Sequence, residues 1–291
     1  MGESEREEMG VNVAKGSRPV RALWVFLALT YALSWGLWIP TALSGRNVTA
    51  TNWLIPYLLG GFGPSVAGVM MAYRTCDKEG QRDFWRRVVD VRRISLGWYV
   101  FIFLVFPIGF AAGLAVAALL GKSVPVLDGV RQIGSNPATL VGMLLVSIVL
   151  GALSEELGWR GFALDEVQAR WSPLLSSLIL AFFWWAWHLP LFFMPGTTQH
   201  AWGIGTDWFW LFTAQTVPLS VLMTWVYNRN EHSTLAAILL HFASNFTVGL
   251  MQPLTVWIFG LQVGFLFVVA TGLVLIDGAG DGWEEPSSSK G

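Results

Sequence analysis

The chain has 291 residues, of which 54% are hydrophobic and only 13% are charged. Soluble domains average about 45–50% apolar and about 25% charged residues, so this composition predicts an integral membrane protein. The formal net charge of −1 provides no basic surface for nucleic acid, and we expect no nucleic-acid partner. The single cysteine, Cys76, excludes an intrachain disulfide and a metal site built from cysteines.

Eight apolar runs follow one another along the chain, each about as long as a membrane-spanning helix. They cover residues 22–44, 53–73, 96–120, 138–158, 173–194, 207–227, 233–251 and 254–276. The first run is longer than the apolar core of a signal peptide, although the small residues near Ala42 and Ser44 leave a cleaved signal as the alternative. We predict an all-α fold of about eight transmembrane helices in one bundle with a polar intramembrane cavity.

The two ends of the chain differ from the apolar runs between them. Residues 1–20 and 278–291 have too few apolar side chains to bury a core, and we expect disordered tails there. Residues 21–277 then form one transmembrane domain, whose functional motifs lie within residues 150–250.

A basic segment joins the second and third runs. It carries seven basic residues: Arg74, Lys78, Arg82, Arg86, Arg87, Arg92 and Arg93. Phe84 and Trp85 are interleaved with them, as in a basic amphipathic helix on an anionic leaflet, and a plain positive loop is a compatible interpretation. With this segment inside, the predicted topology places fifteen of the 18 Lys and Arg residues in the cytoplasm. We expect a multi-pass protein of the cell membrane with both termini cytoplasmic.

The fourth run ends in three ionisable residues within six positions. Glu156 and Arg160 are four residues apart, so they share one helix face and can form an ion pair, while Glu155 lies about 100° round the helix. An ionisable group at membrane depth is costly unless it is paired or lines a wet cavity, which makes it a candidate functional residue. The alternative is that both acids lie at a helix end near the membrane surface.

Two further runs each place polar side chains four residues apart. Trp184 and His188 share one face in the fifth run, and His241 and Asn245 share one face in the seventh. Hydrogen bonding between helices in the bilayer could account for either pair alone. Together, a carboxylate, two imidazoles and a carboxamide are what hydrolysis of an amide requires: a base for water and donors for the oxyanion.

These three motifs resemble those of the CPBP family. Its members are the CAAX-processing and bacteriocin-processing intramembrane proteases, also called Abi proteins, and they include the eukaryotic CAAX prenyl endoprotease. The family pattern is Glu-Glu-x-x-x-Arg, an aromatic-x-x-x-His and His-x-x-x-Asn. The chain has Glu155-Glu156 with Arg160, Trp184 with His188, and His241 with Asn245 in the same order. Trp184 stands where phenylalanine is commoner in the family.

The resemblance implies a role for each residue of the motifs. Glu155 would activate water with the help of His188, and His241 and Asn245 would form the oxyanion hole. Glu156 and Arg160 would support the site, and Trp184 would place an aromatic ring on the helix face that carries His188.

The resemblance leaves the need for a metal ion open. We expect no cofactor, because an amide donor such as Asn245 suits an oxyanion better than it suits zinc. The alternative is a zinc ion held by Glu155, His188 and His241.

The sequence thus predicts an intramembrane endopeptidase, similar to CAAX proteases, whose cavity opens to the cytoplasm. The expected partners are the lipid bilayer and a peptide or protein substrate, either prenylated or held near a membrane anchor. The alternatives are a metalloprotease with the same residues and a non-catalytic membrane protein of immunity or transport.

Overall fold

The computed structural model describes residues 21–122 and 127–277, and all regular elements within them are helical. The predicted tails, residues 1–20 and 278–291, lie outside the described residues. The longer helices are α1 (Arg21–Leu43), α3 (Gly63–Thr75), α4 (Lys78–Val89), α5 (Leu96–Leu119), α10 (Pro173–Trp187), α12 (Asp207–Arg229), α13 (Thr234–Leu250) and α14 (Val256–Asp277). The shorter α-helices are α2 (Leu54–Gly61), α6 (Asp128–Ser135), α7 (Ala138–Leu145), α8 (Ser154–Gly158), α9 (Leu164–Gln168) and α11 (Thr198–Trp202). Two π-helical segments, η4 (Val146–Leu153) and η5 (Trp159–Ala163), and three 3-10 turns, η2 (Val48–Ala50), η3 (Val91–Arg93) and η6 (Leu189–Phe193), complete the order.

The eight predicted runs all appear as helices. Among the described residues, six helices are long and apolar enough to cross a membrane. The pair α2 and α3, bent by 43°, makes a seventh when it is counted as one span. The remaining run is α13, which is apolar but has only 17 residues. The predicted all-α, multi-pass fold is therefore confirmed.

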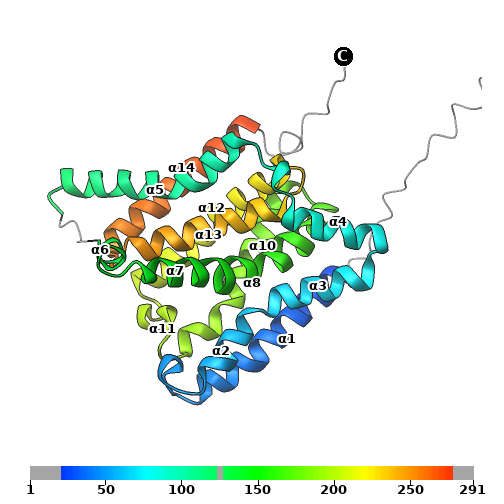
Figure 1. Ribbon diagram of the computed structural model, residues 1–291, viewed down its shortest axis with the longest axis horizontal. Coiled ribbons are helices and arrows are strands. Elements are labelled where there is room, and N and C mark those ends of the chain that lie inside the picture. The colour runs from blue at the N-terminus through cyan, green and yellow to red at the C-terminus, as the bar shows by residue number, and fades with distance from the viewer. Residues whose placement is uncertain (1–20, 123–126, 278–291) are drawn as a thin grey trace, which may run out of the picture.

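The helices form one bundle in which each packs against the next around a shared core (Figure 1). In spatial order, α1 packs on α3, α3 on α8, η4 on α13, α13 on α5, α5 on α14, α14 on α12, and α12 on α10. The buried core includes Phe26 of α1, Trp159 of η5 and Trp187 of α10. Large apolar side chains such as Ile108 and Val268 stay exposed, which suits surfaces that face lipid.

The fourth predicted span is a single helix of 31 residues, Ala138–Gln168. It is not a regular α-helix, because the π-helical segments η4 and η5 stand on either side of the short α8. A π segment shifts the register of the side chains and is frequent at functional sites. Glu155 and Glu156 lie in α8, between the two shifts.

The predicted basic amphipathic helix is present as α4 at one end of the bundle (Figure 1). The side chain of Asp77 caps its start by accepting a hydrogen bond from the backbone N–H of Gly80. Arg87 faces inward and donates to Asp165 at 2.6 Å and to the Tyr227 hydroxyl at 2.9 Å. These contacts tie α4 to the ends of α9 and α12.

Helices α3 and α8 approach one another at glycines. A Cβ atom added to Gly158 would lie 2.1 Å from the carbonyl oxygen of Pro64, and one added to Gly68 would lie 2.5 Å from the carbonyl oxygen of Leu157. Both obstructing atoms belong to the backbone, so a rotamer change cannot relieve the clash. Small residues allow this kind of close helix contact in membranes, and here the contact positions the helix that carries Glu155.

We therefore expect Gly158→Ala to destabilise the protein by about 1–3 kcal/mol, the usual cost of overpacking. Gly264→Ala is the matched control, because Gly264 lies in α14 with open space around its Cβ position. The control should leave stability unchanged or raise it by up to about 1 kcal/mol through helix propensity. Unfolding in detergent micelles measures both variants, and equal stability of the two would contradict the close α3–α8 contact.

Candidate active site

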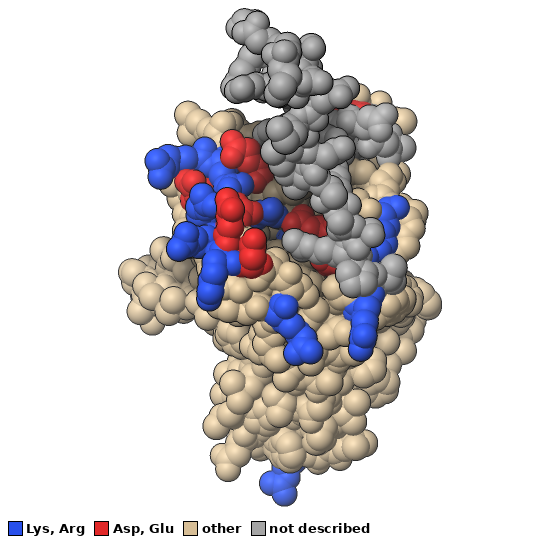
Figure 2. Space-filling model, turned by 90° about the vertical axis from the view of Figure 1, so that its right-hand side faces the viewer, with Lys and Arg blue, Asp and Glu red and all other residues tan. Residues whose placement is uncertain are grey.

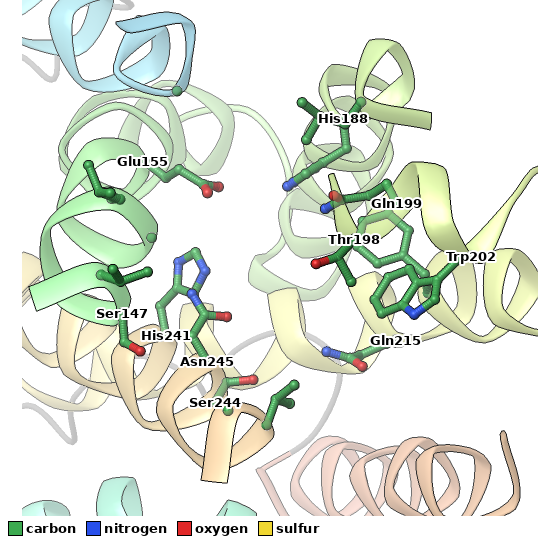
Figure 3. A pocket seen from close by; sticks show the side chains of 18 of the residues that line it. Ser147, Glu155, His188, Thr198, Gln199, Trp202, Gln215, His241, Ser244 and Asn245 are labelled. Carbon is green, nitrogen blue, oxygen red and sulfur yellow. The ribbon is translucent and has the colours of Figure 1, made fainter. Parts of the chain in front are cut away.

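A cavity of about 1040 Å³ lies inside the bundle and contains most of the polar residues that the sequence singled out. Glu155, Trp184, His188, His241 and Asn245 all line it. In Figure 3 the Glu155 carboxylate and the His188 ring point toward one another across the space, with His241 and Asn245 beside them. The structure therefore brings side chains from three separate spans to one place.

Glu155 is buried at the inner end of this cavity. Its Oε2 atom accepts a hydrogen bond of 2.5 Å from the indole Nε1–H of Trp184. This contact orients the carboxylate and leaves its other oxygen without a described partner. The tryptophan of the aromatic-x-x-x-His motif thus contacts Glu155 directly, a contact that sequence spacing could not reveal.

Glu156 lies behind the cavity wall in a fully buried cluster with Arg160 and His241. Arg160 Nη1 donates to both carboxylate oxygens of Glu156, at 3.2 and 3.1 Å. His241 Nδ1 lies 2.8 Å from Glu156 Oε1. Arg160 Nη2 also donates to Ser220 Oγ at 3.1 Å, and its guanidinium carbon is 5.1 Å from the centre of the Trp184 ring. The cluster joins α8, α10, α12 and α13.

His188 stands at the C-terminal end of α10, where the chain turns into η6. Its Nδ1 atom lies 2.7 Å from the carbonyl oxygen of Trp184. A carbonyl oxygen only accepts hydrogen bonds, so Nδ1 carries the hydrogen and Nε2 keeps its lone pair. His188 can therefore accept a proton or a hydrogen bond from a molecule in the cavity.

Asn245 lies one helical turn beyond His241 on α13 and is half-buried at the cavity wall. Its amide faces Gly151 of η4, where a Cβ atom would lie 2.5 Å from Asn245 Nδ2. Glycine at position 151 thus leaves room for the amide. The Nδ2 group can donate to an oxygen atom bound in the cavity.

The cavity is also lined by polar residues that the motifs did not predict. They are Tyr57 of α2, Thr139 of α7, Ser147 of η4, Thr198 and Gln199 of α11, Gln215 and Thr216 of α12, Ser244 of α13, and Gln252 after α13. The sequence could have indicated Gln215, because it is the one carboxamide side chain in the apolar run 207–227. Tyr57, Thr198, Gln199 and Gln252 lie in short helices or connections, and their spatial position depends on the tertiary fold.

Glu155, His188 and His241 do not form a metal-binding group in this arrangement. Among residues 21–122 and 127–277, no three His, Cys, Asp or Glu side chains are placed to hold one ion. His241 directs Nδ1 at Glu156, and Glu155 is engaged by an indole N–H. The described geometry does not fit the zinc set given as the alternative.

The cavity opens at the end of the bundle opposite α4. The basic segment lies at the start of α13, because Arg93 donates to the carbonyl oxygen of Glu231. Gln252 follows the other end of α13, about 25 Å away along a helix of 17 residues. Gln252 and Thr198 line the cavity and are exposed, whereas Glu155 is buried. The cavity and the basic segment were both expected on the cytoplasmic side, whereas the structure places them at opposite ends of the bundle.

Comparison with known proteins places these residues in a family context. Residues 137–247 match the family model described as Type II CAAX prenyl endopeptidase Rce1-like, and all three motifs lie within the match. The chain is also 28% identical over 259 residues to a protein of Methanococcus maripaludis named CAAX prenyl protease 2. That alignment covers 87% of this chain and 93% of the relative. The predicted family resemblance is confirmed.

The buried Glu156–Arg160 pair yields a prediction about stability. Glu156→Gln and Arg160→Met should each cost about 3–5 kcal/mol, because each leaves one buried charge without its partner. The double variant should cost less than the sum of the two by about 0.5–3 kcal/mol. Chemical unfolding of all four proteins in detergent measures this coupling.

The control for this cycle is the exposed pair Asp128 and Arg131, whose charged atoms are 3.6 Å apart. Asp128→Asn with Arg131→Met should show a coupling below about 1 kcal/mol, because solvent screens the pair. A coupling for Glu156 and Arg160 that is no larger than the control would contradict a buried ionic cluster.

Proposed function

We propose that this membrane protein, which carries a CAAX prenyl endopeptidase-like domain at residues 137–247, is an intramembrane endopeptidase that uses water activated by Glu155 and His188. The observation that carries the proposal is the shared cavity. Glu155 and His188 face one another across a space large enough for an extended peptide and a water molecule (Figure 3).

Glu155 acts as the general base in this mechanism. The Glu155 oxygen that Trp184 does not engage accepts a proton from water as the water oxygen attacks the peptide carbonyl carbon. His188 Nε2 accepts a hydrogen bond from the same water and orients it. When the carbon–nitrogen bond breaks, Glu155 returns the proton to the leaving amine, so the reaction ends with both side chains in their starting states.

His241 and Asn245 stabilise the charge that develops on the carbonyl oxygen. Asn245 offers its Nδ2–H group to the oxyanion. One proton held between His241 Nδ1 and Glu156 Oε1 lets His241 Nε2 carry a second hydrogen toward the cavity. Removing one such donor from an enzyme typically costs 10²–10³-fold in kcat.

Glu156 and Arg160 act through His241 rather than on the substrate. Both are completely buried and neither lines the cavity. Their ion pair fixes the ring of His241 through Glu156 and packs the Arg160 guanidinium against Trp184. We assign them a positioning role.

We expect Glu155→Gln to lower kcat for cleavage of a quenched CAAX-type peptide by about 10²–10⁴-fold, the usual contribution of a general base. The glutamine keeps an oxygen that can accept from Trp184, so the fold should survive. His188→Ala should also reduce the rate strongly. Purified protein in detergent, with unfolding monitored in parallel, measures both effects.

The matched control is His200→Ala, because His200 is exposed and does not line the cavity. This variant should cleave at the wild-type rate. Wild-type rates in both Glu155→Gln and His188→Ala would contradict the assignment of the reaction to these two residues. Absence of cleavage by the wild-type protein itself would favour a non-catalytic immunity or transport protein of the same fold.

Metal dependence separates the glutamate mechanism from the zinc alternative. We expect exhaustive chelation to leave the cleavage rate unchanged, since no step assigned to Glu155, His188 or His241 needs an ion. Elemental analysis of the treated, active protein should find no stoichiometric zinc. Loss of activity that zinc alone restores would instead support a metalloprotease.

A further inference from the structure

We infer that the cavity receives uncharged, extended segments of exported or membrane-anchored polypeptides from the non-cytoplasmic side of the membrane. This inference rests on the proposed peptidase function and specifies its substrates. Two independent features carry it: the separation of the charged end of the bundle from the cavity mouth, and the lack of Lys, Arg and Asp side chains in the described lining of the cavity.

Basic side chains gather at the α4 end of the bundle. Exposed basic residues there are Arg74, Lys78, Arg82, Arg86 and Arg92. Figure 2 shows Lys and Arg grouped over one part of this face, while most of the lower part of the same view is uncharged. At the opposite end the described basic residues are Arg46, Lys122 and Arg131. Excess Lys and Arg mark the cytoplasmic side of a membrane protein, so α4 faces the cytoplasm.

The route from α4 to the site is filled with side chains. Phe84 of α4 packs over Gly161, and Trp159, Arg160 and Leu164 behind it are completely buried. Neither water nor a peptide can reach Glu155 by that route without unpacking the core.

The route from the other end is open. Thr198 of α11 and Gln252 after α13 are exposed at the cavity mouth, and Glu155 and His188 lie at its inner end. Loop 44–53 is at the same end, because the backbone N–H of Val48 donates to the carbonyl oxygen of Pro195. With α4 in the cytoplasm, this mouth faces outward.

The lining of the cavity contains no Lys, Arg or Asp among the described residues. Its ionisable side chains are Tyr57, Glu155, His188 and His241. A substrate that ends three residues after the cleaved bond would bring its terminal carboxylate about 10 Å from the reacting carbonyl. In this cavity that carboxylate would meet no Lys or Arg side chain of the described lining, and burying an unpaired charge is unfavourable.

The lining instead suits a neutral polypeptide backbone. Gln199, Gln215 and Gln252 offer carboxamides, and the Gln215 Oε1 atom is buried with no hydrogen-bond partner among the described residues. A peptide N–H can satisfy this oxygen. Trp202 and Trp208 stack at 5.7 Å and provide an apolar surface for a substrate side chain. An internal, uncharged stretch of chain therefore matches the site better than a free carboxyl terminus.

Thiol labelling tests the orientation without reference to activity. In a Cys76→Ser background, Arg46→Cys places one thiol at the cavity end and Lys78→Cys places one on α4, both at exposed positions. A membrane-impermeant maleimide added to intact cells should label Arg46→Cys, and it should label Lys78→Cys only after permeabilisation. The reverse pattern would overturn the outward-facing mouth.

Peptide cleavage tests the neutral cavity. Two peptides of one apolar sequence, ending in a carboxylate or in a carboxamide, are compared in detergent, with Glu155→Gln as the blank. We expect the carboxamide to be cleaved at least as fast as the carboxylate. A preference for the carboxylate of about tenfold or more, equivalent to about 1.4 kcal/mol, would overturn the inference about substrate charge.

The two experiments also separate this inference from the proposed function. If neither peptide nor an exported protein substrate shows cleavage that depends on Glu155, the peptidase function itself fails. If cleavage occurs in detergent but the labelling places Arg46→Cys in the cytoplasm, the peptidase function stands and the outward-facing mouth is wrong.

Discussion

The buried ion pair between Glu156 and Arg160 is the interaction on which the rest of the site depends. Both side chains are fully excluded from solvent, and the carboxylate also contacts His241. Two charges in such surroundings are tolerated only when their partners are in place, so the pair holds α8 and α13 in one relative position. Arg160 extends the constraint to α10 through the Trp184 ring. The proposed reacting groups are thus positioned by two residues that do not line the cavity.

Backbone features allow this cluster to form. Glycines bring α3 and α8 into close contact, and π-helical segments on both sides of α8 change the direction in which its side chains point. Within α8, Glu155 faces the cavity and its neighbour Glu156 faces the ionic cluster. In an α-helix the side chains of adjacent residues point about 100° apart around the axis. The two adjacent carboxylates therefore lie in two different environments, the cavity and the buried ionic cluster.

Charge is distributed unevenly along the bundle. One end carries most of the exposed basic residues. The cavity that opens at the other end is lined by amides, hydroxyls, aromatic rings and the side chains of Glu155, His188 and His241, without a described Lys or Arg. In the proposed orientation the basic end lies in the cytoplasm, and the lining of the cavity selects the proposed polypeptide substrates. The same fold can present its active site to different compartments when the basic residues move from one end to the other, since the positive-inside rule depends on them.

The sequence by itself determined the helical, multi-pass character, the order of the spans and the three polar motifs. These features are local, because hydropathy over about 20 residues identifies a membrane helix and i, i+4 spacing identifies a shared face. It also indicated the family through Glu155, His188, His241 and their neighbours, as the family-model match confirms. The catalytic roles of these residues remain predictions.

Only the tertiary structure decided which side chains meet and where the cavity opens. The hydrogen bond from Trp184 to Glu155 and the contact of His241 with Glu156 join residues 29 and 85 positions apart. Tyr57, Gln199 and the other unpredicted lining residues reach the cavity because of how short segments pack. Local patterns carry no information about such contacts, since helix tilt, π-helical shifts and close glycine contacts arise only when the helices pack together.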